Sequence, residues 1–156
     1  MARAGLAKKA MDRGVKWLNI FAVDNVLQRI ADPVFVGAVI DGGYVSGATV
    51  VRKAARDEKV GAMCLEDGRP SIIEYYEMTD ELMDAKNDKG DPAYNFGVIL
   101  NYLFSINELE AIRERNLPLH VVEKKIPYID DNKNLIKPES PNGYKFESLV
   151  LDMVHE

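Results

Sequence analysis

The sequence predicts an α/β fold, in which strands of a largely parallel sheet alternate with helices. The first observation is the stretch at residues 17–23, which is apolar except for Asn19 and ends at Asp24 and Asn25. Near-continuous apolar character is typical of a strand that is buried on both faces of a parallel sheet. The second observation is the order strand, helix, strand over residues 17–53, from which α/β sheets are built.

Composition limits the class of protein. The chain has 156 residues, 47% of them hydrophobic and 29% charged, as expected of one globular domain with a real core. A formal net charge of −5 argues against nucleic-acid binding, which needs a basic face. The sequence contains no run of about 18 apolar residues, so it predicts no membrane span. It has no continuous apolar stretch near Met1, so it predicts no secretory signal. The single cysteine, Cys64, is expected to be a buried thiol, and we expect a cytoplasmic protein.

The first half of the chain predicts alternating elements. A helix over 2–13 ends at Gly14, and a strand follows at 17–23. Asp32 and Pro33 begin a second helix, with proline at its first position, and a strand is expected at 48–53. Asp67 and Gly68 form a tight turn between strands at 60–66 and 69–77.

The second half predicts three more helices and two more strands. Thr79 begins a short helix, and a strand follows at 94–104. Ser105 and Glu108 have the spacing of a capping box before another short helix. After a strand at 120–128, a turn at 130–134 and a loop to 143, an amphipathic helix is expected. Its apolar residues are Phe146, Leu149, Val150 and Met153.

Two carboxylates are candidates for function. Asp24 would lie at the carboxyl edge of the sheet, where it can hold Mg²⁺ against a phosphate; the alternative is a simple turn or helix cap. Strand alternation places Glu74 on one face with Ile72 and Tyr76, an unusual position for a carboxylate without a partner. Glu74 therefore faces a cavity for a polar ligand, or it forms a salt bridge at the margin of the sheet.

Lys145 is the candidate cation. It is expected in the first turn of the last helix, where the helix dipole disfavours a cation unless an anion such as phosphate binds beside it. The alternative is a surface lysine paired with Glu147 or Glu139. His120 has no neighbouring serine, cysteine or second histidine, and we interpret it as structural. No zinc-ligand spacing, G-x-G-x-x-G motif or P-loop occurs.

Six motifs together resemble one family. They are residues 23–25 (VDN), 73–77 (IEYYE), 94–97 (YNFG), 123–128 (EKKIPY), 136–138 (IKP) and 141–147 (PNGYKFE). Their order and separation resemble the central portion of the UDP-sugar pyrophosphorylases, most of all the UDP-N-acetylhexosamine branch. The resemblance implies an α/β domain with a mixed, mostly parallel sheet flanked by helices, a Rossmann-like nucleotide-diphospho-sugar transferase fold. It also implies the transfer of UMP from UTP to a sugar 1-phosphate with release of pyrophosphate.

The resemblance implies a role for each site residue. Asp24 would contact the nucleotide phosphates through Mg²⁺, and Lys145 would offset charge on the phosphates. Such catalysis consists mainly of positioning and charge stabilisation, so no nucleophilic side chain is needed. The implied sugar 1-phosphate is N-acetylglucosamine 1-phosphate, with glucose 1-phosphate as the alternative. The residues implied to line the sugar pocket are Gly61, Glu74, Tyr75, Asn95, Phe96 and Gly97.

The chain departs from the family pattern at two places. Val98 stands where the N-acetylhexosamine enzymes have an asparagine that approaches the sugar. The family's glycine-rich nucleotide loop and uracil-binding segment have no counterpart, so residues 1–156 are expected to form one partial domain. We therefore expect the chain alone not to turn over UTP, and to self-associate or belong to a longer enzyme. A non-catalytic UDP-sugar-binding module and a purely structural fragment remain the alternatives.

Overall fold

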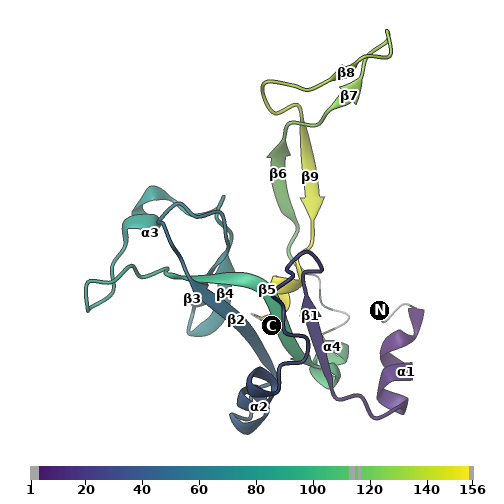
Figure 1. The fold of residues 1–156 in the computed structure, drawn as a ribbon, viewed down its shortest axis with the longest axis vertical. Coiled ribbons are helices and arrows are strands. Elements are labelled where there is room, and N and C mark those ends of the chain that lie inside the picture. Colours follow the sequence, from purple (N-terminus) through teal and green to yellow (C-terminus); the bar gives the residue numbers. More distant parts are fainter. Residues whose placement is uncertain (1–3, 113–114, 116, 155–156) are drawn as a thin grey trace.

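The central element is β5 (Phe96–Ser105), around which a five-stranded sheet is built. The computed structural model describes residues 4–112, 115 and 117–154. Strands β1 (Trp17–Phe21) and β2 (Ser46–Arg52) lie on opposite sides of β5. The hairpin of β3 (Ala62–Glu66) and β4 (Arg69–Ile73) extends the sheet beside the beginning of β5 (Figure 1).

The prediction of a mostly parallel sheet is wrong. In the part of the chain that the structure describes, every pairing between strands is antiparallel. The expected order of strand, helix and strand is present as β1, α2 and β2. Because β1 and β2 both run opposite to β5, they share one direction. They are not neighbours, however, because β5 lies between them: Phe104 is opposite both Leu18 and Ser46. The α/β class of the fold is retained.

The predicted helix starts are largely confirmed. Helix α2 (Pro33–Asp41) begins after Asp32, whose side chain accepts a hydrogen bond from the Val34 N–H at 2.9 Å. Helix α3 (Asp80–Asp84) begins after Thr79, whose hydroxyl accepts from the Leu82 N–H at 3.3 Å.

Each of the two remaining helices differs from expectation in one respect. Helix α1 (Leu6–Asp12) is shorter than the predicted helix at 2–13, of which residues 2 and 3 lie outside the described residues. Helix α4 (Ile106–Ala111) has Ser105 as its N-cap residue, but the Ser105 side chain makes no capping hydrogen bond. The capping box is therefore wrong, although the start of the helix is right.

The C-terminal third forms an arm that projects from the sheet (Figure 1). Its strands are β6 (His120–Lys124) and β9 (Gly143–Glu147), with the small hairpin of β7 (Tyr128–Ile129) and β8 (Leu135–Ile136) at the tip. The predicted strand at 120–128 is thus two strands, and the predicted loop contains β8. The chain then returns to the sheet as the 3₁₀ helix η2 (Val150–Val154).

The predicted C-terminal α-helix is also wrong. Residues 143–147 pair with β6 over five positions, from His120 opposite Glu147 to Lys124 opposite Gly143. Phe146 lies in this strand, whereas Val150 and Met153 lie in η2. The helical spacing of the apolar residues therefore arose from two different elements that follow one another.

The core lies where β4, β5 and η2 meet. Ile72, Tyr102, Phe104 and Leu151 form one buried cluster there. Leu103 and Ile106 are fully buried as well. Cys64 is a partly buried free thiol, and burial raises its pKa. Among the described residues, no helix is long and apolar enough to cross a membrane.

Candidate functional site

A cavity of about 270 Å³ contains two of the predicted sugar-site residues, Gly61 and Glu74. Its wall is formed by residues 59–61 before β3, by Glu74 after β4, by part of β5 and by residues 149–151, where η2 begins. Both candidates lie at strand ends, Gly61 directly before β3 and Glu74 directly after β4. Val98 and Tyr102 from β5 line the same cavity. The antiparallel hairpin of β3 and β4 thus brings together Gly61 and Glu74, which lie at its two open ends.

Gly61 gives this cavity its space. A Cβ atom at this position would lie 3.0 Å from the Ile72 Cγ2, 3.2 Å from the Val98 Cγ2 and 3.4 Å from the Glu74 Oε1. The first two distances are tighter than ordinary carbon contacts, so a side chain here would press against Ile72 and Val98 and would lie in contact with the Glu74 carboxylate. Gly97 has a different role, since its Cβ would lie 2.7 Å from the Val60 Cγ2. It allows the Val60 segment to pack against β5.

Glu74 is half-buried, and its environment disfavours the charged form. Burial, together with the nearby charge of Glu77, raises the pKa of Glu74, while His120 opposes the rise. The prediction that Glu74 lies inside a strand is wrong, because β4 ends at Ile73 and residues 75–77 form a turn. The Glu77 N–H donates to the Glu74 carbonyl oxygen at 2.9 Å. Glu74 therefore does not take part in the strand alternation of side chains that the sequence suggested.

The remaining sugar-side candidates lie near this turn or at the start of β5. Tyr75 packs edge-to-face on Tyr76, with ring centroids 5.2 Å apart. Burial and the charge of Glu74 raise the pKa of Tyr76 to about 12. Asn95 lines a separate cavity of about 130 Å³, and its carbonyl oxygen accepts the Lys53 N–H at 2.9 Å. The structure therefore groups Gly61 with Glu74 and places Asn95 outside that cavity.

Asp24 lies in the turn after β1, and Lys145 lies in the arm. Asp24 is exposed in the turn after β1, where the Asn25 side chain orders the backbone by accepting the Leu27 N–H at 3.1 Å. Lys145 lies in β9, so its expected place in the first turn of a helix is wrong. The Lys145 Nζ is 2.6 Å from the Glu147 Oε2, which is the surface pair considered as the alternative. Neither residue lines the cavities of about 460, 130, 80 and 270 Å³ that lie among the described residues.

The donor set at Asp24 is a single carboxylate. Among the described residues, no group of three or more His, Cys, Asp or Glu side chains could hold a metal ion. One exposed carboxylate still suits Mg²⁺, since this ion is commonly held by one or two carboxylates together with substrate phosphates and water.

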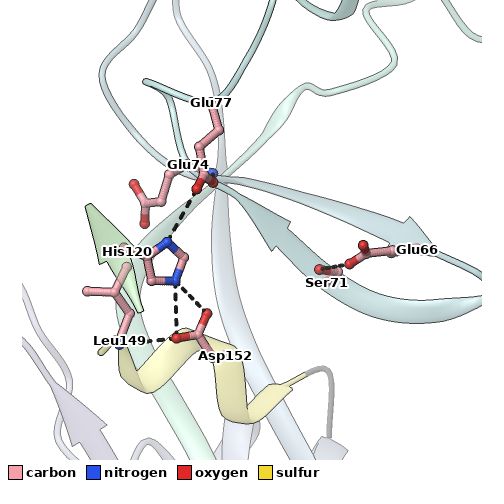
Figure 2. Close-up of polar contacts among 7 residues, drawn as sticks. All are labelled: Glu66, Ser71, Glu74, Glu77, His120, Leu149 and Asp152. Carbon is pink, nitrogen blue, oxygen red and sulfur yellow. Dashed lines mark hydrogen bonds and ion pairs between the residues drawn. The ribbon is translucent and has the colours of Figure 1, made fainter. Parts of the chain in front are cut away.

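Sequence reasoning missed a polar cluster around His120 (Figure 2). The His120 Nδ1 is 3.3 Å from the Glu77 Oε1, and the His120 Nε2 is 3.0 Å from the Asp152 Oδ1. A cavity of about 460 Å³ runs along these three side chains. His120 is a well-partnered histidine, as interpreted from the sequence. No sequence signal indicated its partners, because they come from a turn and from a 3₁₀ helix that was expected to be an α-helix.

The chain is similar to proteins of one known family. A family model described as UTP–glucose-1-phosphate uridylyltransferase matches residues 1–150. The human UDP-N-acetylhexosamine pyrophosphorylase-like protein 1 is 42% identical over 90% of this chain, which corresponds to 28% of the human protein. The UDP-N-acetylglucosamine pyrophosphorylase of Saccharomyces cerevisiae is 37% identical over 90% of this chain and 30% of its own length.

A solved structure has the same fold. The uridine diphosphate N-acetylglucosamine pyrophosphorylase of Trypanosoma brucei, in complex with an inhibitor, superposes with a TM-score of 0.78 at 26% identity. The match covers 96% of this chain and 27% of that protein. The chain therefore spans under a third of the length of these relatives.

Proposed function

Because this chain belongs to the UTP–glucose-1-phosphate uridylyltransferase family, we propose that it forms the sugar-binding part of a UDP-sugar pyrophosphorylase. The complete reaction transfers UMP from UTP to a sugar 1-phosphate. A phosphate oxygen of the sugar 1-phosphate attacks the α-phosphorus of UTP, and the bond to the leaving pyrophosphate breaks. Since the chain covers under a third of its relatives' length, we assign it only part of this site: the sugar pocket and two residues on the phosphate side.

One observation carries the proposal: Gly61 leaves room beside the Glu74 carboxylate in a cavity that both residues line. A carboxylate can accept hydrogen bonds from two sugar hydroxyls, and these bonds are stronger than those to a neutral acceptor. The half-burial of Glu74, which is costly without a ligand, supports this role. Tyr75, Asn95 and Gly97 remain proposed members of the same sugar site, on the ground of the family resemblance.

The phosphate side of the site is assigned to Asp24 and Lys145. Asp24 would hold Mg²⁺ beside the phosphates, where this ion neutralises their charge. The Lys145 ammonium would exchange its Glu147 partner for a phosphate oxygen and so stabilise charge in the transition state. Lys145 is half-exposed, which supports such an exchange.

The proposed sugar is N-acetylglucosamine, because the relatives named above carry UDP-N-acetylhexosamine or UDP-N-acetylglucosamine in their names. Glucose is the alternative. Val98 lines the cavity with an apolar side chain in place of an amide. A valine offers no hydrogen bond to an acetamido group, so this position favours glucose.

The test is binding of UDP-N-acetylglucosamine to the 156-residue chain, measured by isothermal titration calorimetry and ligand-detected NMR. We expect saturable binding that competes with UDP-glucose. The Glu74→Gln variant should bind about tenfold or more weakly, since a hydrogen bond to a charged group contributes about 1.5–3 kcal/mol. The Glu139→Gln variant is the matched control, because Glu139 is an exposed glutamate on the arm.

Equal binding by the Glu74→Gln and Glu139→Gln variants would contradict the assignment of Glu74 to the sugar. Absence of any UDP-sugar binding would favour a purely structural role for the chain. A pyrophosphate-release assay with UTP and N-acetylglucosamine 1-phosphate is expected to be negative for this chain, and measurable release would contradict the assignment of only part of the site.

A non-catalytic UDP-sugar-binding module is the second candidate. It is favoured by the finding that, among the described residues, neither Asp24 nor Lys145 lines the cavity of Glu74. Asp24→Asn separates the two functions. Binding of UDP-N-acetylglucosamine that is unchanged by this substitution and by removal of Mg²⁺ would indicate the non-catalytic module.

A further inference from the structure

His120 connects three segments that are far apart in the sequence (Figure 2). It is the first residue of β6, Glu77 lies in the turn after β4, and Asp152 lies in η2. The His120 Nδ1 is 3.3 Å from the Glu77 Oε1, and the His120 Nε2 is 3.0 and 3.2 Å from the two Asp152 carboxylate oxygens. Because carboxylates only accept hydrogen bonds, both ring nitrogens must donate. Only the protonated imidazolium has two N–H groups.

This bridge continues into the backbone on both sides. The Asp152 Oδ2 accepts the Leu149 N–H at 3.1 Å, which fixes the entry into η2. The Glu77 Oε2 accepts the Glu74 N–H at 3.1 Å. The Glu77 carboxylate therefore contacts His120 and also holds the backbone of Glu74, the residue proposed to bind the sugar.

The bridge also reaches the strand that carries Lys145. His120 is opposite Glu147 in the pairing of β6 with β9, and Glu147 forms the ion pair with Lys145. At this junction the arm is poorly packed, since a cavity of about 460 Å³ runs along His120, Glu77 and Asp152. The side chains of His120 and Asp152 are nevertheless only 12% and 8% exposed. Polar contacts rather than close packing hold the base of the arm here.

We propose that His120 is a positioning residue whose doubly bridged ring fixes the base of the β6–β9 arm, and with it Lys145, relative to Glu74. The inference rests on the proposed function, because it concerns the two sides of that site. It assigns His120 no contact with substrate. Its effect passes through Glu77 to Glu74 on one side and through β9 to Lys145 on the other.

The charges around the ring make this bridge dependent on pH. Glu77 and Asp152 contact the ring, and Glu74 and Glu147 add negative charge nearby; Glu66, Cys64 and Tyr94 line the adjoining cavity. Burial alone would lower the pKa of His120, but Asp152 and then Glu77 outweigh it and raise the pKa above its usual 6.5. The bridge is therefore complete below about pH 6.5 and is lost as the pH rises through the raised pKa of the folded state.

The first experiment is a ring titration by NMR, which begins with the bridge residues unchanged. The chain has two histidines, so the His155→Gln variant leaves one imidazole signal, that of His120. We expect this signal to titrate above 6.5, and the Glu77→Gln substitution to lower its pKa. Glu139→Gln is the matched control and should leave it unchanged. Titration at or below 6.5 would overturn the proposal.

The second experiment is hydrogen–deuterium exchange, corrected for the intrinsic effect of pH. In the His120→Gln variant we expect amides of the β6–β9 pair and of Glu74 to exchange about tenfold or more faster, because a charged bridge is lost. Amides of the β1–β5 pair should be unchanged, which excludes general unfolding. In the unsubstituted chain the same arm amides should become faster above the His120 pKa, and in His120→Gln this pH effect should vanish.

Binding measurements separate the two proposals. If the unsubstituted chain binds no UDP-sugar, the proposed function fails, while the exchange data still decide whether His120 fixes the arm. If it binds UDP-N-acetylglucosamine and His120→Gln binds several-fold more weakly, the positioning role is supported. Unchanged arm exchange in His120→Gln, or equal binding despite a loosened arm, would overturn it without affecting the proposed function.

Discussion

At the scale of single residues, Glu74 combines a proposed binding role with a cost to folding. Its half-buried carboxyl lies close to Glu77, and burial followed by that charge raises its pKa. A carboxyl whose pKa is raised on folding is easier to ionise in the unfolded chain. The free energy of unfolding therefore falls as the pH rises from the usual pKa of 4.5 through the raised folded value.

Glu74→Gln removes this unfavourable charge and retains the shape of the side chain. We expect the variant to have a higher urea midpoint than the unsubstituted chain at pH 7, and no such advantage at a pH below 4.5, where both forms are neutral. Urea denaturation at the two pH values measures the difference. A lower midpoint at pH 7 would mean that the carboxylate is stabilised by a partner in the folded state.

Val98 is the residue at which the choice of sugar is most open to test. It lines the cavity with Gly61 and Glu74, where its side chain offers no hydrogen bond. In the Val98→Asn variant an amide would point into the same space. We expect the ratio of the affinities for UDP-N-acetylglucosamine and UDP-glucose to rise about fivefold, the effect of one neutral hydrogen bond of about 1 kcal/mol. Calorimetry with both ligands measures the ratio, and an unchanged ratio would place the acetamido group elsewhere.

At the scale of elements, a line of polar side chains joins β1, β5 and β2. The Asn19 Nδ2 donates to the Asn101 Oδ1 at 2.9 Å, and the Asn101 Nδ2 donates to the Thr49 Oγ1 at 3.0 Å. Asn101 is the buried member, with 6% of its surface exposed. The Asn19 Oδ1 also accepts the Ala31 N–H at 3.0 Å, which ties the connection before α2 to the sheet.

Asn101→Ala would break this line at its centre. Because it leaves Thr49 and part of Asn19 without their partner in a buried place, we expect the free energy of unfolding to fall by about 2–3 kcal/mol. Urea denaturation measures this loss. Asn107→Ala, at an exposed position in α4, is the control and should change stability by less than about 0.5 kcal/mol. A similar small change for Asn101→Ala would show that water replaces the lost bonds.

The elements also show what the sequence could predict. Helix starts at Asp32 and Thr79 and the Asp67–Gly68 turn follow from local chemistry, and the structure confirms them. The position of a strand in the sheet does not follow from local chemistry. The alternation of side chains does not predict that β5 lies between β1 and β2, or that residues 143–147 pair with β6. Long-range pairing decided both, against the helical period of the C-terminal segment.

The candidate site follows the same division. Gly61 and Glu74 were predicted from motifs, and the hairpin brings them to one cavity. The His120 cluster could not be predicted, because its carboxylates come from a turn that interrupts a predicted strand and from a 3₁₀ helix. Residue types alone gave no indication that these groups meet.

At the scale of the whole molecule, apolar side chains are concentrated on the connection between β1 and α2. Four of them are largely exposed: Val23 at 95%, Val26 at 93%, Leu27 at 86% and Ile30 at 68%. They follow β1, which within the described residues pairs only with β5, so its second edge has no partner strand there. An open strand edge beside exposed apolar residues favours association.

We therefore expect the chain to self-associate through this connection, in solutions that contain no other protein. Sedimentation velocity should show a weight-average mass that rises with concentration across the micromolar range. The double variant Val26→Lys and Leu27→Lys should shift this rise to higher concentration, because two charges would have to be buried without partners. Leu135→Lys is the control, since Leu135 is a 60% exposed apolar residue at the tip of the arm. A monomer at every concentration would contradict self-association, and an equal effect of Leu135→Lys would move the contact from the β1–α2 connection to the arm.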